Sequence, residues 1–283
     1  MSKQFTATAV LLLAGDGKLS IDDAVSAHVP GLPGWARRVT IAELMRHTSG
    51  IPDFDDLLIW PGNPTRPVIE ARLSQRITQA QFLKVIAAAP ALRFEPGQRF
   101  EYANSNYLLL AEIVARASGT PLPQFLRERI FRPLGLAMVL NPDGDIAGKA
   151  MSYKDVGDGP QIVDYHWEPL GEGGIQTTAS ELVRWGDNYR TGTVGGRRLL
   201  QAQVASPVRT ESIAWAYGLG DDFTYAAGIA LAADGTLAHT GHWEGFATAF
   251  EVRPDRRTVM AATCNVPHLS PNVLTAKLRE IWT

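Results

Sequence analysis

The chain has 283 residues, enough to bury a large core in one big domain or in two. Its 27 basic and 29 acidic residues give a formal net charge of -2, so no positive excess favours a nucleic acid or an anionic membrane as partner. Cys264 is the only cysteine, which excludes an intrachain disulfide and disfavours a cysteine-based zinc site.

The first segment, residues 1–14, reads as a helix closed by Gly15 and Gly17. Its apolar run from residue 7 to residue 14 is too short to span a bilayer. No basic segment leads into an apolar stretch with a cleavage site, so no signal peptide is recognised. Because the chain opens directly in a buried helix with no strand before it, we expect further residues upstream. Export and localisation therefore stay open.

Helical periodicity recurs in four later segments, at residues 40–44, 79–88, 104–117 and 179–189. The first of them opens with a capping box, in which Thr40 is the cap and Glu43 stands three residues later. Two stretches rich in proline and glycine, 60–64 and 141–159, are predicted to be loops.

The last quarter of the chain changes to short apolar segments, at residues 228–231, 237–239, 247–252 and 258–263. Asp234-Gly235 and Pro254-Asp255 separate them and are hairpin turn signals. An amphipathic helix, 272–282, follows. We predict an α+β fold, with a mainly helical region (1–205) joined to an antiparallel sheet region with a C-terminal helix (206–283). The two regions are expected to form one catalytic unit.

Three short patterns occur in order along the chain: Met1-Ser2-Lys3, Tyr102-Ala103-Asn104 and His239-Thr240-Gly241. Longer motif-like stretches accompany them, at residues 47–54, 94–107, 133–136 and 173–179. Together they resemble the Ser-x-x-Lys, Tyr-x-Asn and Lys-Thr-Gly motifs of serine β-lactamases and penicillin-binding proteins, in the class C and carboxylesterase branch. The resemblance covers nearly the whole chain. It implies the β-lactamase/transpeptidase-like fold, with N-terminal strands that this chain lacks.

The resemblance also implies an acyl-enzyme reaction on an ester or amide, such as a β-lactam, an ester or a D-amino-acid peptide. Lys3 and Tyr102 would form the acid/base pair, joined by a hydrogen bond. Asn104 would hold the substrate amide or orient the lysine. A lysine three residues after a serine lies on the same helix face, which suits proton transfer between them. No cofactor and no metal are implied.

The third motif would form the wall of the cleft. His239, Thr240 and Gly241 are expected to contact the substrate. The backbone N–H of His242 would join that of the nucleophile in an oxyanion hole. A lysine stands at the position of His239 in the family motif. Histidine is mostly neutral at pH 7 but still donates a hydrogen bond, which suits esterase and peptidase relatives better than a strict β-lactamase.

The nucleophile is the main departure from the pattern. Counting back from Lys3 places it one position before Met1, and Ser2 is a poor substitute because adjacent side chains on a helix point about 100° apart. Either the serine precedes Met1 in a longer chain, or the protein has lost hydrolase activity. In the second case it would be a scaffold of penicillin-binding type that binds peptidoglycan fragments or partners.

The remaining predictions concern partners and one further histidine. His47 is expected to stabilise a loop rather than to transfer protons. The predicted partner is a small-molecule acyl substrate, with no nucleic acid and no membrane span. If the N-terminal strands of the family are missing, an exposed sheet edge would favour oligomers.

Overall fold

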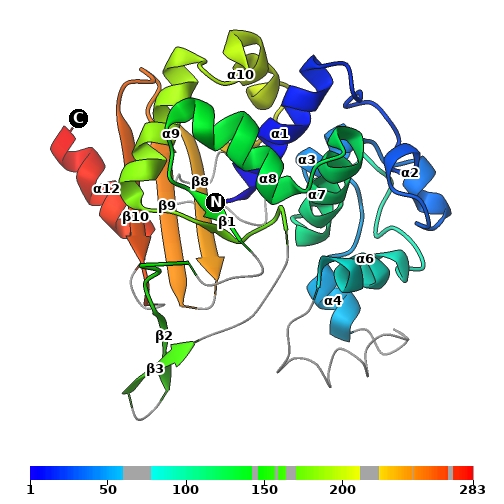
Figure 1. The fold of residues 1–283 in the computed structure, drawn as a ribbon, viewed down its shortest axis with the longest axis horizontal. Coiled ribbons are helices and arrows are strands. Elements are labelled where there is room, and N and C mark those ends of the chain that lie inside the picture. The colour runs from blue at the N-terminus through cyan, green and yellow to red at the C-terminus, as the bar shows by residue number, and fades with distance from the viewer. Residues whose placement is uncertain are drawn as a thin grey trace.

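The computed structural model describes residues 1–59, 78–141, 146–156, 159–163, 170–210, 223–243, 245–266 and 270–282 (Figure 1). Most helices gather on one side of a six-stranded sheet, with α1 (Lys3–Gly15) among them, and a C-terminal helix lies against the other side of the sheet. This arrangement confirms the predicted α+β class. The predicted loop at residues 60–64 lies outside the described residues.

The helical part contains the predicted helices and several that the sequence patterns did not reveal. The predicted ones are α1, α3 (Ile41–Met45), α6 (Gln79–Ala87), α7 (Asn104–Ser118) and α9 (Ala179–Thr191). The additional α-helices are α2 (Val25–His28), α4 (Phe54–Ile59), α8 (Leu122–Leu126) and α10 (Gly196–Val204). The described residues also include short helical turns at Gly34–Arg37, Arg127–Phe131 and Arg132–Leu134.

Local signals account for where the predicted helices begin and end. Thr40 and Glu43 form the expected capping box, in which each side chain accepts a hydrogen bond from the backbone N–H of the other residue. Helix α7 ends at Gly119, whose φ of 70° is in the left-handed region that favours glycine. Gly192 ends α9 in the same way, with a φ of 65°.

The large sheet is antiparallel throughout, in the order β10-β9-β8-β7-β6-β5. Its strands are β5 (Val208–Arg209), β6 (Phe223–Tyr225), β7 (Ala230–Ala232), β8 (Leu237–Trp243), β9 (Phe246–Val252) and β10 (Val259–Cys264). The turn signals at Asp234 and Pro254 lie between paired strands, so both predicted hairpins are confirmed. Helix α12 (Pro271–Trp282) confirms the predicted closing helix.

Helices cover both faces of the sheet near β9 and β10 (Figure 1). Successive side chains of a strand point to opposite faces. On β9, Glu251 pairs with Arg279 of α12. Val252, the next residue, pairs across the ladder with Val259, which lies against Gly186 of α9. The alternation therefore places α12 and α9 on opposite faces of the sheet.

The prediction of a loop over residues 141–159 is wrong in its second half. Strands β2 (Ser152–Val156) and β3 (Gly159–Val163) form an antiparallel hairpin there. Contacts with the distant Asn265 hold the first strand, because its amide donates to the Met151 carbonyl and its carbonyl accepts from the N–H of Tyr153. Contacts between residues this far apart in the sequence cannot be predicted from local composition. Two further short strands, β1 (Val139–Leu140) and β4 (Ile175–Gln176), pair with each other.

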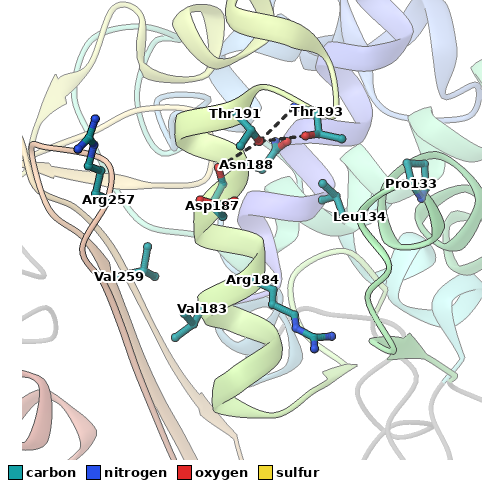
Figure 2. A pocket seen from close by; sticks show the side chains of 10 residues that line it. All are labelled: Pro133, Leu134, Val183, Arg184, Asp187, Asn188, Thr191, Thr193, Arg257 and Val259. Atoms are coloured by element: carbon teal, nitrogen blue, oxygen red, sulfur yellow. Dashed lines mark hydrogen bonds between the residues drawn. The ribbon is translucent and has the colours of Figure 1, made fainter.

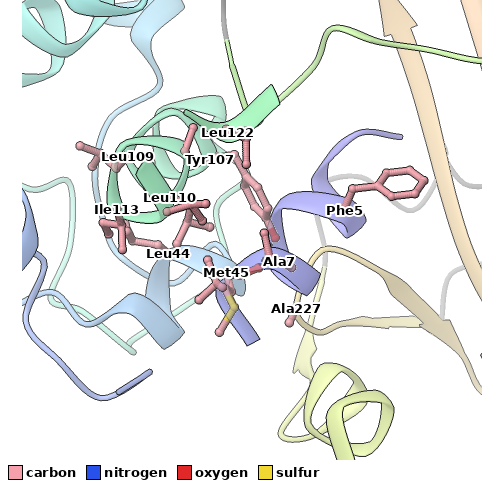
Figure 3. Packing of buried hydrophobic residues seen from close by; sticks show 14 of the residues in the cluster. Phe5, Ala7, Leu44, Met45, Tyr107, Leu109, Leu110, Ile113, Leu122 and Ala227 are labelled. Atoms are coloured by element: carbon pink, nitrogen blue, oxygen red, sulfur yellow. Dashed lines mark hydrogen bonds between the residues drawn. The ribbon is translucent and has the colours of Figure 1, made fainter. Parts of the chain in front are cut away.

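Helix α1 is the centre of the hydrophobic core and is buried along most of its length (Figure 3). The ring of Phe5 packs at 4.6 Å from that of Trp185 and at 5.7 Å from that of Phe131. Gln4, also buried, accepts a hydrogen bond of 2.7 Å from the Trp185 indole. A residue of another element therefore holds this polar side chain near the N-terminus of α1.

No helix within the described residues combines the length and apolar character needed to cross a membrane. The division into regions 1–205 and 206–283 stays a prediction, although the large sheet does begin at Val208.

Candidate active site

The first turn of α1 meets an open edge of the sheet. Strand β7 pairs with β8 at Leu237 and Ala238, and within the described residues this ladder does not continue along residues 240–242. The α-ammonium of Met1 lies there and donates a 2.7 Å hydrogen bond to the carbonyl of Thr240. The third motif is predicted to form a cleft wall, and the strand that carries it lies here next to the N-terminus of α1.

Lys3 is the central charged group of this site and only 3% of its surface is exposed. Its Nζ donates to Oδ1 of Asn104 at 2.7 Å and to the carbonyl of Glu172 at 3.1 Å. The Glu172 carboxylate lies 3.7 Å from the same nitrogen. Burial lowers the pKa of Lys3, and attraction to Glu172 opposes this change. A lysine whose pKa is lowered by burial is suited to act as a base.

Tyr102 lies against Lys3, but not through the predicted hydrogen bond. Nζ of Lys3 is 4.9 Å from the centre of the Tyr102 ring, a cation–π contact. The ammonium is directed instead toward the oxygens of Asn104 and Glu172, which are better acceptors. Burial and the charges of Glu172 and Asp53 raise the pKa of the Tyr102 hydroxyl well above its usual value. The hydroxyl therefore keeps its proton at neutral pH.

Asn104 is placed by the start of α7, where it is the first helical residue. Its backbone N–H donates to Oδ2 of Asp53 at 2.6 Å, so a carboxylate satisfies an N–H group that the helix leaves free. Its side-chain oxygen faces Lys3. Of the two expected roles of Asn104, orienting the lysine is the one that this geometry favours.

His239 has a different environment from the one expected. Its side chain is 1% exposed, Nδ1 lies 2.6 Å from the Thr240 carbonyl and Nε2 lies 3.2 Å from the hydroxyl of Tyr225. A proton on Nδ1 satisfies the carbonyl and leaves Nε2 to accept from the tyrosine. Burial lowers the pKa of His239 well below its usual value. With both nitrogens engaged, the ring holds no free donor for a substrate, so the expected side-chain contact stays a prediction.

The next three residues continue along the open edge of β8. Thr240 and Gly241 are half-buried, and His242 is exposed. Groups on alternate residues of a strand point to the same edge, so the N–H of His242 faces the side on which the Thr240 carbonyl meets Met1. A side chain at Gly241 would come within 2.5 Å of the Thr248 hydroxyl. Thr248 therefore packs closely against the backbone of β8 next to the place where the oxyanion hole is predicted.

His47 lies fully buried between the first and second motifs. Its Nδ1 accepts a hydrogen bond from the N–H of Ala103 at 3.2 Å and lies 3.1 Å from the Asn106 amide. Its ring stacks on that of Tyr102 with centres 4.2 Å apart. These contacts confirm the predicted loop-stabilising role and extend it, because the loop held in place carries Tyr102. Nε2 has no hydrogen-bond partner in the described part of the chain.

Sequence patterns missed Glu172, Tyr225 and Asp53 as members of the site. Glu172 lies in a glycine-rich segment, 171–174, whose following residues were recognised only as a family motif. An acidic residue among glycines next to an apolar stretch was the one available signal. Asp53 and Tyr225 reach the site through contacts with Asn104 and His239, which no local pattern encodes.

Ser2 is part of the supporting structure. Its side chain is buried and its Oγ accepts a 3.2 Å hydrogen bond from the N–H of Ile175. This agrees with the expectation that Ser2 is a poor substitute for the nucleophile.

A separate hollow of about 500 Å³ lies between α9 and the strand end at Val259 (Figure 2). Arg184 and Asp187, which line it, pair with Glu181 and Arg190 of the same helix. None of the predicted site residues lines it. Within the described residues, no group of three or more His, Cys, Asp or Glu side chains is arranged to hold a metal ion.

Comparison with known proteins identifies the family and the fold of the chain. A family model described as Beta-lactamase matches residues 1–280. Penicillin-binding protein 4* of Bacillus subtilis is 25% identical, over 94% of this chain and 59% of that protein. D-aminopeptidase of Brucella anthropi is 29% identical, over 83% of this chain and 44% of that protein. The chain thus spans about half the length of these two relatives.

Among solved structures, the penicillin binding protein from Bacillus halodurans superimposes with a TM-score of 0.80 at 25% identity. The match covers 98% of this chain and 83% of that one. The β-lactamase/transpeptidase-like fold implied by the three motifs is therefore confirmed. A family match over almost every residue, together with this fold, leads to one conclusion: the chain belongs to the Beta-lactamase family.

Proposed function

We propose that this chain forms the acyl-transfer site of a serine hydrolase that cleaves an ester or amide through an acyl-enzyme. The nucleophile is a serine placed directly before Met1 in a longer chain, as the Ser-x-x-Lys spacing requires. Regions 1–205 and 206–283 act as one catalytic unit, because the first supplies Lys3 and Tyr102 and the second supplies the open edge of β8.

The buried ammonium of Lys3 is the observation that carries this proposal. Burial of a charged lysine costs several kcal/mol because the charge leaves water. A lysine that is buried in spite of this cost is therefore a candidate for a functional role. Here the group lies at the first turn of α1, with Asn104 at 2.7 Å and the face of Tyr102 at 4.9 Å. A serine one turn earlier would lie on the same helix face as Lys3.

In the first step, the neutral amine of Lys3 accepts the proton of the serine hydroxyl while the serine oxygen attacks the acyl carbon. The N–H of His242 stabilises the oxyanion that forms. The bond to the alcohol or amine then breaks, and that leaving group takes the proton back from Lys3 or by way of Tyr102. Water repeats the sequence on the acyl-enzyme, releases the carboxylic acid and restores the serine.

We propose small acyl compounds as the substrate class. The similarity to a D-aminopeptidase and to a penicillin-binding protein supports D-amino-acid amides, peptides and esters as the first substrates to test. The neutral state of His239 disfavours strong binding of a substrate carboxylate, which supports an esterase or aminopeptidase over a strict β-lactamase.

The test compares this chain with one extended upstream to include the serine before Met1, and with the same extension carrying alanine there. A short-chain nitrophenyl ester, a D-alanine nitroanilide and a chromogenic cephalosporin serve as substrates. We expect turnover in the serine form alone, and its loss by at least about a hundredfold in Lys3→Met.

Turnover that survives the alanine change or Lys3→Met would refute the mechanism. If no form turns over any substrate although all are folded, the scaffold interpretation gains support. Binding of a peptidoglycan fragment, followed by calorimetry, would then be the measurement to make.

Self-association through the sheet edge is a further part of the proposal. Strand β10 is the last in the sheet order, and among the described residues its one strand partner is β9. Sedimentation of wild type and of a variant with Thr263→Pro, which weakens an edge strand, tests it. A monomer at all concentrations would refute it.

A further inference from the structure

The segment 171–175 is fastened to α1 at three points. The hydroxyl of Thr6 donates to the carbonyl of Gly171 at 2.7 Å. Ser2 accepts from the N–H of Ile175 at 3.2 Å, and the ammonium of Lys3 donates to the carbonyl of Glu172 at 3.1 Å. Two side chains of α1 and that of Ser2, directly before it, thus hold a segment about 170 residues away in sequence, and Lys3 is in the middle of the contact.

The backbone around Glu172 has little freedom to move away. Gly171 has a φ of +96°, and a side chain there would come within 2.8 Å of Ala111 and closer still to the Tyr107 carbonyl, both on α7. The segment is therefore pressed between α1 and α7. This geometry places the side chain of Glu172 next to Lys3.

The two carboxylate oxygens of Glu172 have different surroundings. Oε2 lies 3.7 Å from Nζ of Lys3. Oε1 is buried with no hydrogen-bond partner in the described residues, and only 9% of the residue is exposed. Burial of a carboxylate oxygen without a hydrogen-bond partner among the described residues is costly, so the nearby Lys3 ammonium is the main interaction that offsets this cost.

We propose that Glu172 is a positioning residue for Lys3: its carboxylate keeps the ammonium charged and directed at Asn104, and so sets the pH above which Lys3 becomes a free base. The catalytic meaning of this control rests on the function proposed above. The ion pair itself does not, and it can be measured in the chain as it stands.

The sign of the effect follows from the charges. A carboxylate beside an ammonium favours the charged form, so it raises the pH at which the lysine loses its proton. Glu172→Gln removes this attraction and leaves a side chain of the same shape. Other titratable groups around the pair stay in place in the variant: the Met1 α-ammonium, Asp53, Asp55, Tyr102, His47 and His239.

The experiment follows the charge of Lys3 directly. The chain has six lysines, so labelling lysine with ¹³C at Cε gives few signals, and Lys3→Met identifies the one from Lys3. Titration of that signal reports the pH at which Lys3 is half protonated. We expect this midpoint to fall by at least about one pH unit in Glu172→Gln.

Two variants make the result specific. Glu172→Asp keeps the charge but withdraws it by one methylene, so we expect a midpoint between wild type and Glu172→Gln. Glu95→Gln removes one negative charge that is exposed and paired with Arg38, and should leave the Lys3 signal unchanged. If Glu172→Gln does not fold, the lowered midpoint of Glu172→Asp still tests the idea. The proposal is overturned if the Lys3 midpoint is the same in wild type and all folded variants. It is also overturned if the Lys3 signal shows no titration up to pH 11 in any of them.

A second readout separates this proposal from the proposed function. In the extended chain that carries the serine, Glu172→Gln should move the acidic limb of kcat/KM to lower pH. Glu172→Asp should move it in the same direction by a smaller amount. If no extended chain turns over a substrate but the Lys3 midpoint falls as expected, the ion pair stands and the hydrolase proposal fails.

Discussion

Nζ of Lys3 lies 2.7 Å from Oδ1 of Asn104, a residue 101 positions further along the chain. This hydrogen bond joins the start of α1 to the start of α7 at the place where two of the three motifs meet. Both helices begin at this point, so their first residues direct side chains and backbone N–H groups into the same small volume. The site is therefore built from helix ends, where a helix leaves N–H groups free.

The first prediction concerns this bond. Asn104→Ala removes the acceptor and leaves a buried ammonium with one neutral partner fewer. We expect a loss of about 1.5–3 kcal/mol in the free energy of unfolding, the range for hydrogen bonds to charged groups, measured by urea denaturation. Asn104→Asp keeps an oxygen at the same place and should lose less than Asn104→Ala. Equal stability of both variants and wild type would show that the bond contributes nothing.

The second prediction uses the buried imidazole of His47, whose pKa burial holds well below the usual value. Below about pH 6.5 the unfolded chain binds a proton at this residue and the folded protein does not, so stability falls as the pH falls. Each such group contributes up to about 1.4 kcal/mol per pH unit. His239, also buried, acts in the same direction.

His47→Asn isolates this contribution, because asparagine can accept from Ala103 and tolerates the φ of 57° found at residue 47. We expect the variant to be less stable than wild type at pH 7.5, and the gap to shrink by up to about 2 kcal/mol at pH 5. Burial raises the pKa of Asp55 to about 6. Its contribution to the free energy of unfolding therefore falls as the pH rises from about 4 to about 6, which is the opposite direction. It is present in both proteins and cancels in the difference.

Denaturation curves of wild type and His47→Asn across this pH range provide the measurement, with His242→Asn, at an exposed histidine, as the control. A gap of constant size between wild type and His47→Asn would contradict the prediction.

The third prediction concerns Gly186 in the middle of α9. Replacement of a helical glycine by alanine usually stabilises a protein by about 1 kcal/mol. Here the new Cβ would lie within 2.8 Å of Cγ2 of Val259 and closer still to Cγ1, so the helix could no longer approach β10. We expect Gly186→Ala to cost about 1–3 kcal/mol through overpacking.

Gly15→Ala is the matched control, because nothing lies within 4 Å of a Cβ at the end of α1. It should leave the melting temperature unchanged or slightly raised. In a double-mutant cycle, Val259→Ala should recover part of the loss caused by Gly186→Ala. If the two losses simply add, the predicted clash is absent.

The fourth prediction concerns the ion pair that fastens α12 to the sheet. Oε2 of the buried Glu251 lies 3.3 Å from Nε of Arg279. Arg279→Met leaves that carboxylate buried without its cation, and we expect a loss of about 2–3 kcal/mol. The double variant Glu251→Leu/Arg279→Met should be clearly more stable than Arg279→Met alone. Thermal unfolding provides the comparison, and a double variant less stable than either single one would refute the argument.

The sequence by itself determined much of the fold and the family. Helix α3 begins at a capping box, α7 and α9 end at glycines, and two strand pairs are joined at turn signals. Each of these features depends on residues a few positions apart, so a local pattern is sufficient to predict it. The family could be recognised in the same way, because each of the three motifs consists of residues close together in the sequence.

Only the tertiary structure decided which groups surround Lys3 and how they are oriented. Glu172 reaches Lys3 from 169 positions away, and the two ring nitrogens of His239 meet the Tyr225 hydroxyl and the Thr240 carbonyl. The hairpin of β2 and β3, in a segment predicted to be a loop, is held by Asn265. These contacts depend on how helices and strands pack around α1. Their energies come from burial and from pairing of distant charges, and neither is visible in the neighbouring residues of the chain.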